Sequence, residues 1–240
     1  MCQLLGVSAN IEVDLQLSLR EFKHRGEANP HGWGLAHFHD SKWTLIKEPR
    51  TLAGENIEDE RFRFRSRTIV GHVRLRSCGS VSHVNTHPFV RGNWAFAHNG
   101  TISAIKKRPE FKLTKYRREG GTDSEHAFCY LLEKIEERPN NIVKVLEDEA
   151  EKICELGAFN FLLSDGETLY TYGDHNLWYV AREHPFRKVQ LKYDRFELEL
   201  SDIKDAAERA ILVATEPLTE GEDWKRLTGL MKFTDGKMAN

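Results

Sequence analysis

The second residue of the chain is a cysteine, and an apolar run follows it in the opening segment MCQLLGV. Methionine aminopeptidase removes an initiator methionine when the next side chain is small, so we expect Cys2 to become the first residue of the mature protein. A free α-amine has a pKa of about 7.7–8.0, against about 10.4 for a lysine ammonium, so it can act as the base for its own thiol. Cys2 is therefore a candidate nucleophile, and a buried structural cysteine is the alternative.

The tripeptide His98-Asn99-Gly100 follows a short apolar segment. Asn99 offers a side-chain amide donor, and Gly100 offers a backbone N–H that no side chain shields. Two such donors at the end of a strand can form an oxyanion hole for acyl transfer. Asn-Gly is also a common hairpin dipeptide, so a simple turn is the competing interpretation.

Two charged residues are candidates for substrate binding. Arg74 ends an apolar strand segment, and its planar guanidinium suits a substrate carboxylate, although an internal Asp or Glu would pair with it equally well. Asp123 stands at the start of an expected helix. There it is either an N-cap or a partner for a substrate ammonium group.

Histidines provide the main alternative chemistry, a metal-dependent hydrolase. The histidines that could be assembled into a ligand set are His31, His37, His39, His83 and His87. His37 and His39 fall on one face of a strand, but no HExxH motif or carboxylate cluster supports them. His87 and His98 fit better as residues that orient loops through hydrogen bonds, so we expect neither a metal nor a cofactor.

Composition is typical of a globular protein with one sizeable core. The 240 residues are 40% hydrophobic and 30% charged, and 35 Lys and Arg nearly balance 37 Asp and Glu. Because the charges balance, the protein has no net electrostatic field that would attract nucleic acid or an acidic membrane. The Arg-rich run over 61–67 is typical of a solvated face. The four cysteines lack CxxC spacing, which favours a reducing compartment. With no membrane-length apolar stretch and no secretory signal, we expect a cytoplasmic protein.

Hydrophobic patterning predicts a mixture of strands and helices. We expect short buried strands over 2–7, 68–75 and 94–98, a hairpin over 31–48 that turns at Asp40-Ser41-Lys42, and helices over 13–22, 122–138 and 140–156. Beyond Gly157 the pattern changes to strands and tight turns, and both Asp165-Gly166 and Gly173-Asp174 are of hairpin type. No linker separates the two halves, so we expect a single α+β domain over 1–240.

Five short motifs occur in a fixed order: the N-terminal Cys2, GHVR, NTHPF, HNG and GGTDSE. Together they resemble the class II glutamine amidotransferases, which belong to the N-terminal-nucleophile hydrolases. The segment RGEANPHGWGLAHF is also similar to the stand-alone members of YafJ type. Each motif is weak by itself, but the five in order are specific.

The resemblance implies a four-layer αββα sandwich in which two antiparallel sheets lie between helical layers. It implies that Cys2 is the nucleophile, that Asn99 and Gly100 form the oxyanion hole, and that Arg74 and Asp123 hold the α-carboxylate and α-ammonium of a γ-glutamyl substrate. It further places Ser77 and His87 among the substrate-binding residues. The expected activity is hydrolysis of the γ-carboxamide of glutamine or of a related γ-glutamyl amide.

The chain also departs from the aminotransferase members of that family. Where they have RWATHG, this chain has RLRSCG, so Leu75 replaces the aromatic residue that covers the substrate and Cys78 replaces a histidine. Ser77 keeps a hydroxyl where threonine is common, and either Trp33 or Trp94 is a candidate for the missing aromatic cover.

We expect the glutaminase-like domain to take up essentially all of these 240 residues, without the acceptor domain of those enzymes. Either a separate acceptor or synthase subunit receives the ammonia, or water completes a hydrolysis. A dedicated γ-glutamyl peptide or amide hydrolase, of the kind used in ergothioneine synthesis or glutathione breakdown, is one alternative. A non-catalytic partner subunit that only binds γ-glutamyl compounds is another, but binding needs neither a nucleophile nor oxyanion donors.

Overall fold

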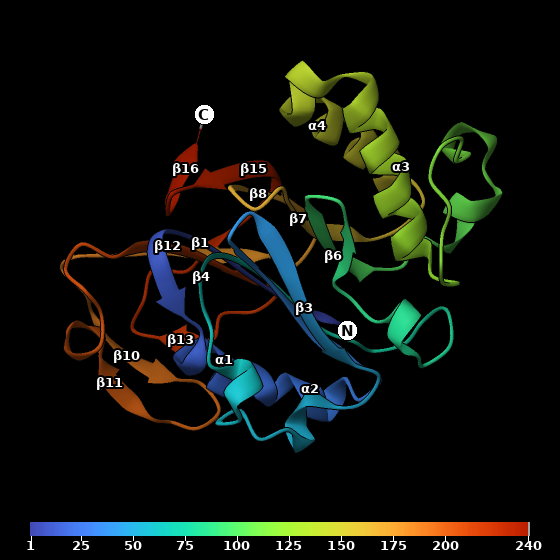
Figure 1. Ribbon diagram of the computed structural model, residues 1–240. Helices are drawn as coiled ribbons and strands as arrows, with labels where there is room; N and C mark the ends of the chain where they lie inside the picture. The colour runs from blue at the N-terminus through green and yellow to red at the C-terminus, as the bar shows by residue number, and fades with distance from the viewer. Residues whose placement is uncertain (240) are drawn as a thin grey trace.

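Two large antiparallel sheets form the centre of the computed structural model, which describes residues 1–239 (Figure 1). The seven-stranded sheet has the order β14 (Lys225–Arg226), β9 (Trp178–Glu183), β12 (Arg209–Ala214), β1 (Gln3–Asp14), β4 (Arg65–Val73), β2 (Trp33–His39) and β3 (Lys42–Glu48). The six-stranded sheet has the order β16 (Lys237–Ala239), β15 (Gly229–Thr234), β8 (Thr168–Gly173), β7 (Phe159–Ser164), β6 (Trp94–Gly100) and β5 (Phe89–Arg91). A third, small sheet contains β11 (Glu197–Glu199), β10 (Lys188–Leu191) and β13 (Thr219–Glu220).

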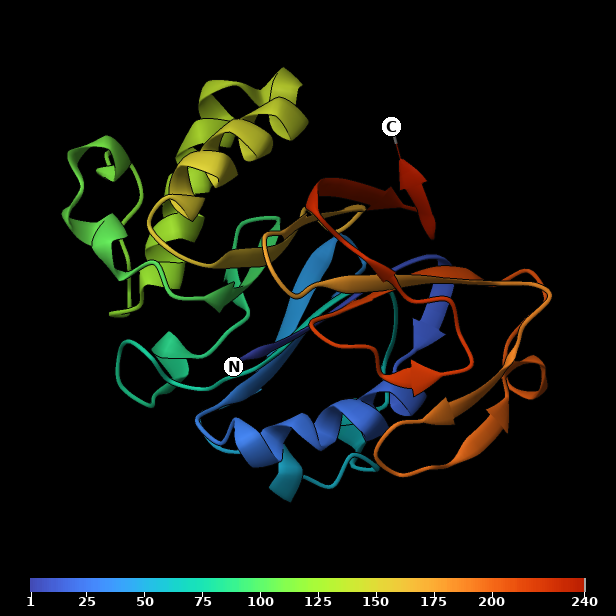
Figure 2. The same ribbon diagram turned by 180° about the vertical axis from the view of Figure 1, so that it is seen from behind.

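Helices cover the outer face of each large sheet, as Figures 1 and 2 show from opposite sides. The seven-stranded sheet is covered by α1 (Gln16–Lys23) and α2 (Arg25–Ala28), and the six-stranded sheet by α3 (Asp123–Glu137) and α4 (Ile142–Cys154). Short 3₁₀ turns occur at Leu52–Gly54, Glu60–Phe62, His83–Asn85, Ser103–Lys107, Pro109–Phe111, Pro139–Asn141 and Leu200–Asp202. The predicted αββα sandwich is confirmed.

The pleat of the strands divides the apolar side chains among three cores. In β1, Leu4 packs between the two sheets, whereas its neighbour Leu5 packs against α1. In β6, Ala95 and Ala97 face the other sheet, and Phe96 between them packs toward the helices. The small alanines let the two sheets approach closely at the centre of the molecule.

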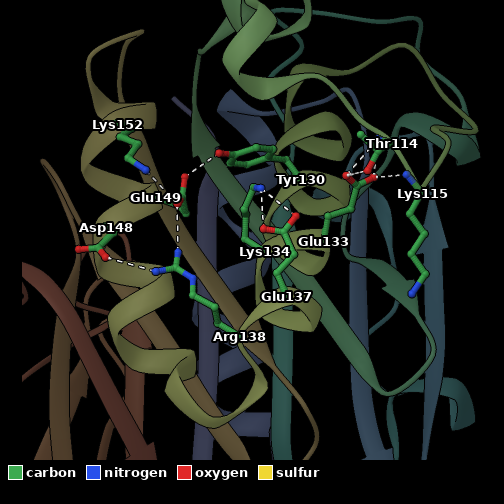
Figure 3. Close-up of polar contacts among 10 residues, drawn as sticks. All are labelled: Thr114, Lys115, Tyr130, Glu133, Lys134, Glu137, Arg138, Asp148, Glu149 and Lys152. Carbon is green, nitrogen blue, oxygen red and sulfur yellow. Dashed lines mark hydrogen bonds and ion pairs between the residues drawn. The ribbon is translucent and has the colours of Figure 1, made fainter.

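Polar contacts join α3 to α4 on the side away from the sheet (Figure 3). The hydroxyl of Tyr130 donates to Glu149 at 2.6 Å, and Arg138 and Lys152 pair with the same carboxylate. One hydroxyl and two cations therefore compensate the desolvation of the buried Glu149 carboxylate. These contacts hold the two helices together as one layer.

Glu133 of α3 fastens the segment that leads into this helix (Figure 3). Its carboxylate accepts hydrogen bonds from the backbone N–H groups of Thr114, Lys115 and Tyr116 at 2.7–3.0 Å. Burial opposes the charge, but these donors hold the pKa of Glu133 below its ordinary value. Glu133 thereby ties residues 114–116 to α3.

Several expected elements are confirmed, and some boundaries are corrected. The hairpin over 31–48 turns at Asp40 and Ser41, both with positive φ. The first strand is longer than predicted, because β1 continues to Asp14 after a register shift between Ser8 and Val13 in its pairing with β4. The first helix therefore begins at Gln16 instead of near Val13.

The two predicted hairpin turns in the second half differ in outcome. Asp165-Gly166 joins the neighbouring strands β7 and β8, as expected. The prediction for Gly173-Asp174 is wrong, because β8 and β9 belong to different sheets and the chain crosses between the two layers here. Asn160 explains the tight bend, since its side-chain oxygen accepts from the backbone N–H groups of Asp174 and His175 at 3.0 Å.

Candidate active site

The ends of β1 and β6 bring Cys2 and Asn99 to one place between the sheets. Cys2 immediately precedes β1, which pairs with β12 and β4 in the middle of the seven-stranded sheet. Asn99 is four residues beyond Ala95 in β6, so the alternation of side chains turns it toward the seven-stranded sheet. The two residues lie in different sheets and meet because the sheets are stacked face to face.

A cavity of about 330 Å³ lies at this meeting point. Its lining consists of Met1, Cys2, Leu75, Arg76, Ser77, Asn99, Gly100, Thr101 and Ala158. Four of the seven residues predicted for the site, Cys2, Ser77, Asn99 and Gly100, are thus brought together. The other three, Arg74, His87 and Asp123, lie outside this lining.

The thiol of Cys2 makes its hydrogen bonds with the backbone of Leu75. The N–H of Leu75 donates to Sγ at 3.2 Å, and Sγ is 3.2 Å from the Leu75 carbonyl oxygen. Desolvation by the surrounding protein raises the pKa of Cys2, and the Leu75 contact offsets this only in part. The thiol therefore needs a base to become a nucleophile near neutral pH.

Asn99 is held by two residues that the sequence did not identify. Its Nδ2 donates to the hydroxyl oxygen of Thr215 at 3.3 Å, and the same oxygen accepts from the backbone N–H of Leu4 at 2.8 Å. Asn160, its partner in the β6–β7 register, donates to the Asn99 carbonyl at 3.2 Å. An amide NH₂ has two hydrogens, so one remains available beyond the bond to Thr215.

Gly100 has a conformation that excludes other residues. Its φ is +154°, and a Cβ here would lie 1.8 Å from the carbonyl oxygen of Ala158. The strand therefore requires glycine at this position, and the backbone N–H next to Asn99 has no side chain over it. The simple hairpin turn considered for Asn-Gly is wrong, because both residues are within β6 and pair with β7.

Arg74 is 3% exposed and bonded to its own loop. Its guanidinium donates to the carbonyl oxygens of Cys78 at 2.7 Å and Ser80 at 3.0 Å. Burial lowers the pKa of Arg74, and Cys2 and Asp123 are among the groups whose negative charge would oppose this. The alternative of an internal Asp or Glu partner is therefore wrong, because two backbone carbonyls bind the guanidinium.

Asp123 is buried at the first position of α3, but it is not the N-cap. Thr122 takes that place, and its hydroxyl accepts from the N–H of Glu125 at 3.1 Å. The Asp123 carboxylate instead accepts from the N–H of Ile102 at 2.9 Å and from that of Ser124 at 3.0 Å. Since Ile102 follows Gly100 closely in sequence, this bond ties the helix to the end of β6.

Three buried histidines, His72, His87 and His98, lie close to one another and interact with Arg74 or Asp123. The rings of His72 and His87 have their centroids 4.2 Å apart, and His98 donates through Nε2 to the carbonyl of Ala158 and accepts at Nδ1 from Ser124. Burial lowers the pKa of His72 to about 3 and holds the pKa values of His87 and His98 below their ordinary range. All three are therefore neutral at physiological pH and act as packing and orienting groups.

The histidines of the metal-site alternative are dispersed among separate partners. His37 stacks on Phe64 at 4.1 Å, and His39 pairs with Glu12 at 2.7 Å. His31 accepts from the backbone N–H of Arg76 at 3.2 Å. Over residues 1–239, no three His, Cys, Asp or Glu side chains are placed to hold a metal ion.

The family model of the class II glutamine amidotransferases matches residues 1–240. The chain belongs to this family. An uncharacterized protein of Methanocaldococcus jannaschii is 40% identical over 99% of this chain and 70% of its own length. YafJ of Escherichia coli, named as a glutamine amidotransferase, is 33% identical over 95% of this chain and 94% of its own length.

Solved structures of glutamine amidotransferases share the fold. A predicted glutamine amidotransferase from Pseudomonas aeruginosa superposes over the full length of both chains with a TM-score of 0.73 and 28% identity. The glutamine phosphoribosylpyrophosphate amidotransferase of Bacillus subtilis matches 99% of this chain and 48% of its own, with a TM-score of 0.64 and 17% identity. This second likeness concerns the fold alone.

In this class II glutamine amidotransferase, neither tryptophan replaces the aromatic cover missing at Leu75. Trp33 is fully buried and its indole N–H donates to Glu55 at 3.1 Å. Trp94 stands at the opposite end of β6 from Asn99 and packs near Tyr170. Leu75 itself lines the cavity and is 36% exposed. None of the helices within residues 1–239 is both long and apolar enough to cross a membrane.

Proposed function

We propose that the protein hydrolyses the γ-amide bond of glutamine or of a related γ-glutamyl amide through a thioester on Cys2. The observation that carries the proposal is a cavity whose lining includes Cys2, Asn99 and Gly100, the last in a conformation that excludes a side chain. A nucleophile beside two donors is the arrangement that acyl transfer requires. Membership of the class II glutamine amidotransferases supports this reaction class.

The base in this proposal is the α-amine that Cys2 would have after removal of Met1. Desolvation raises the pKa of the thiol, so the proton has to be taken by a neighbouring group. No His, Asp or Glu is among the residues that line the cavity, and its cations are no bases near pH 7. A free α-amine has a pKa near 8 and is a suitable base for the thiol.

The reaction then proceeds in two steps, formation of a thioester on Cys2 and its hydrolysis. The amine takes the thiol proton, the sulfur attacks the γ-carbonyl, and the oxyanion receives hydrogen bonds from Asn99 and Gly100. The C–N bond breaks as the ammonium returns its proton to the leaving amine, which leaves a γ-glutamyl thioester on Cys2. Water then hydrolyses the thioester, releases glutamate and restores the thiol.

Arg74 and Asp123 are proposed to bind the α-carboxylate and the α-ammonium of the substrate. Both are buried: Arg74 directly precedes the cavity residue Leu75, and Asp123 accepts a hydrogen bond from the N–H of Ile102, two residues beyond Gly100. The substrate carboxylate would replace the Cys78 and Ser80 carbonyls as the partner of Arg74. Ser77 would offer its hydroxyl to the substrate from the cavity wall. His87 would act indirectly, through its ring contact with His72.

Glutamate release from a set of substrates tests the proposal. Purified protein is offered glutamine, γ-glutamyl dipeptides, glutathione and γ-glutamyl amines, and glutamate and ammonia are both measured. Release of glutamate from at least one of them is expected. Release from glutamine with ammonia supports an amidotransferase that serves a separate acceptor subunit, whereas preference for a larger γ-glutamyl amide supports a dedicated hydrolase. No release from any compound contradicts the proposal.

Replacing Asn99 by alanine is expected to lower kcat by about 10²–10³, the usual effect of losing one oxyanion donor. KM for glutamine is expected to change little, because the donor acts on charge that develops in the transition state. The matched control is Asn93→Ala, in the exposed turn just before β6. Steady-state kinetics of the two variants test this prediction. If kcat falls in both variants or in neither, the role of Asn99 is contradicted.

Replacing Arg74 by lysine is expected to raise KM for glutamine by about tenfold or more, because the ammonium cannot reproduce the two-pronged bond to a carboxylate. The fair comparison is with 4-aminobutanamide, which has the same reacting amide but no α-carboxylate. Hydrolysis of this compound is expected to be equal in the variant and the wild type. If the variant loses the same factor on both amides, Arg74 only supports the loop through Cys78 and Ser80.

A further inference from the structure

Arg76 is a cation in the cavity wall that the proposed reaction does not use. Its backbone N–H is fixed by the ring of His31 at 3.2 Å, while its side chain is exposed. Within the described chain, no hydrogen bond or ion pair of its guanidinium is recorded, in contrast to Arg74 two residues earlier. The backbone of Arg76 is therefore held in place, and its charged group is free to bind something else.

The cavity offers this cation no internal counterion. Among the nine lining residues there is no aspartate or glutamate, and the remaining polar groups are the thiol of Cys2, the hydroxyls of Ser77 and Thr101 and the amide of Asn99. The charge of Arg76 also reaches into the site, since it adds to burial in lowering the pKa of Arg74. A cavity with an unpaired guanidinium favours an anionic occupant.

The position of Arg76 indicates which end of a substrate it meets. Arg74 and Asp123, the proposed partners of the glutamyl α-groups, are each only 3% exposed. Arg76 is exposed and lines the same cavity, together with its chain neighbour Leu75. The glutamyl end therefore belongs at the buried pair, and the leaving amine belongs at the open side with Arg76.

We propose that Arg76 binds a carboxylate on the leaving amine, so that the preferred substrate is a γ-glutamyl amide of an amino acid or peptide in place of glutamine itself. This inference rests on the proposed hydrolysis at Cys2. The chemical step is unchanged: the γ-carbonyl–nitrogen bond breaks, the ammonium of Cys2 gives its proton to the departing nitrogen, and an amino acid leaves instead of ammonia. Water then releases glutamate from the thioester.

Two substrates that differ only in this charge test the proposal. γ-Glutamylglycine ends in a carboxylate, and γ-glutamylglycinamide is its neutral counterpart of the same size. The wild type is expected to show a kcat/KM about tenfold higher for the acid than for the amide, as a partly exposed charge-assisted bond provides. Added salt is expected to reduce this ratio, because screening weakens exposed charge pairs.

Variants separate the role of Arg76 from general effects. Arg76→Gln is expected to lower kcat/KM for γ-glutamylglycine by about tenfold and to leave γ-glutamylglycinamide and glutamine within about twofold, and Arg76→Lys is expected to retain part of the preference. Arg187→Gln is the matched control, since Arg187 is exposed on the link between β9 and β10 and does not line this cavity. Equal melting temperatures of the variants confirm that the fold is intact.

The possible results distinguish the two proposals. Equal rates on acid and amide in the wild type, or an equal loss on both in Arg76→Gln, overturn the role of Arg76 while hydrolysis at Cys2 stands. Absence of glutamate release from all three substrates overturns hydrolysis and, with it, the role of Arg76. A preference for the acid that disappears only in Arg76→Gln supports both.

Discussion

Cys2→Ala is expected to abolish glutamate release from every γ-glutamyl amide and to leave the fold intact. The substitution removes the sulfur that would form the thioester, and no other cysteine lines the cavity. The thiol is only partly buried and contacts the backbone of Leu75, so its loss is expected to cost about 1 kcal/mol of stability or less. Activity and stability are thus expected to separate completely in this variant.

The wild-type protein allows a direct test of Cys2 as the terminal nucleophile. Intact mass of the wild type is expected to show loss of Met1, and diazo-oxo-norleucine, an electrophilic glutamine analogue, is expected to add once, at Cys2. Cys154→Ala is the matched control, because Cys154 is also partly exposed but lies in α4. It is expected to keep both activity and labelling. Active protein that retains Met1 would contradict the mechanism.

Acid is expected to destabilise the fold strongly below pH 6.5, through His72, His87 and His98, in a window that extends to about pH 3 for His72. Burial lowers all three pKa values, so the folded state keeps these rings neutral while the unfolded chain binds a proton at each below about pH 6.5. The unfolded state then holds more protons, and stability falls as pH falls. Each histidine contributes up to about 1.4 kcal/mol per pH unit within this window.

Urea unfolding at a series of pH values from 7.5 to 5.5 measures this effect. Most carboxylates remain ionised in both states over this range, so the histidines dominate the slope. His72→Asn is expected to reduce the dependence on pH by about one proton, whereas His175→Asn, a change at an exposed histidine, is expected to leave it unaltered. A free energy of unfolding that stays constant from pH 6.5 to 5.5 would contradict the burial of these neutral rings.

Much of the candidate site follows from local pattern. The alternation of Ala95, Phe96 and Ala97 places Asn99 on the face of β6 that meets the other sheet, and α3 starts where the sequence predicts, with the Thr122 hydroxyl as its cap. The hairpin at Asp40-Ser41 and the order of five motifs are also readable without coordinates. Strand periodicity, capping and turn chemistry act over a few residues, and the sequence alone is enough to specify them.

The partners of the site residues could not be read in this way. Thr215 lies 116 residues from Asn99 in the chain, and nothing in the segment ILVATEPL marks its hydroxyl as the contact that joins β1 to Asn99. Likewise, the choice between a substrate carboxylate, an internal acid and loop carbonyls for Arg74 depended on how the segment up to Ser80 folds back. The crossover at Gly173-Asp174 was also decided at a distance, by Asn160.

The sequence by itself determined the residue types, the layers and the motif order that identify a class II glutamine amidotransferase. Only the tertiary structure decided that Cys2, Asn99 and Gly100 share a cavity, that the buried rings of His72 and His87 contact each other, and that Arg76 is in the cavity wall unpaired. The physical reason is that pairing within a sheet and packing between sheets join segments far apart in the chain. These contacts are fixed by the register and stacking of the whole fold, which no local pattern contains.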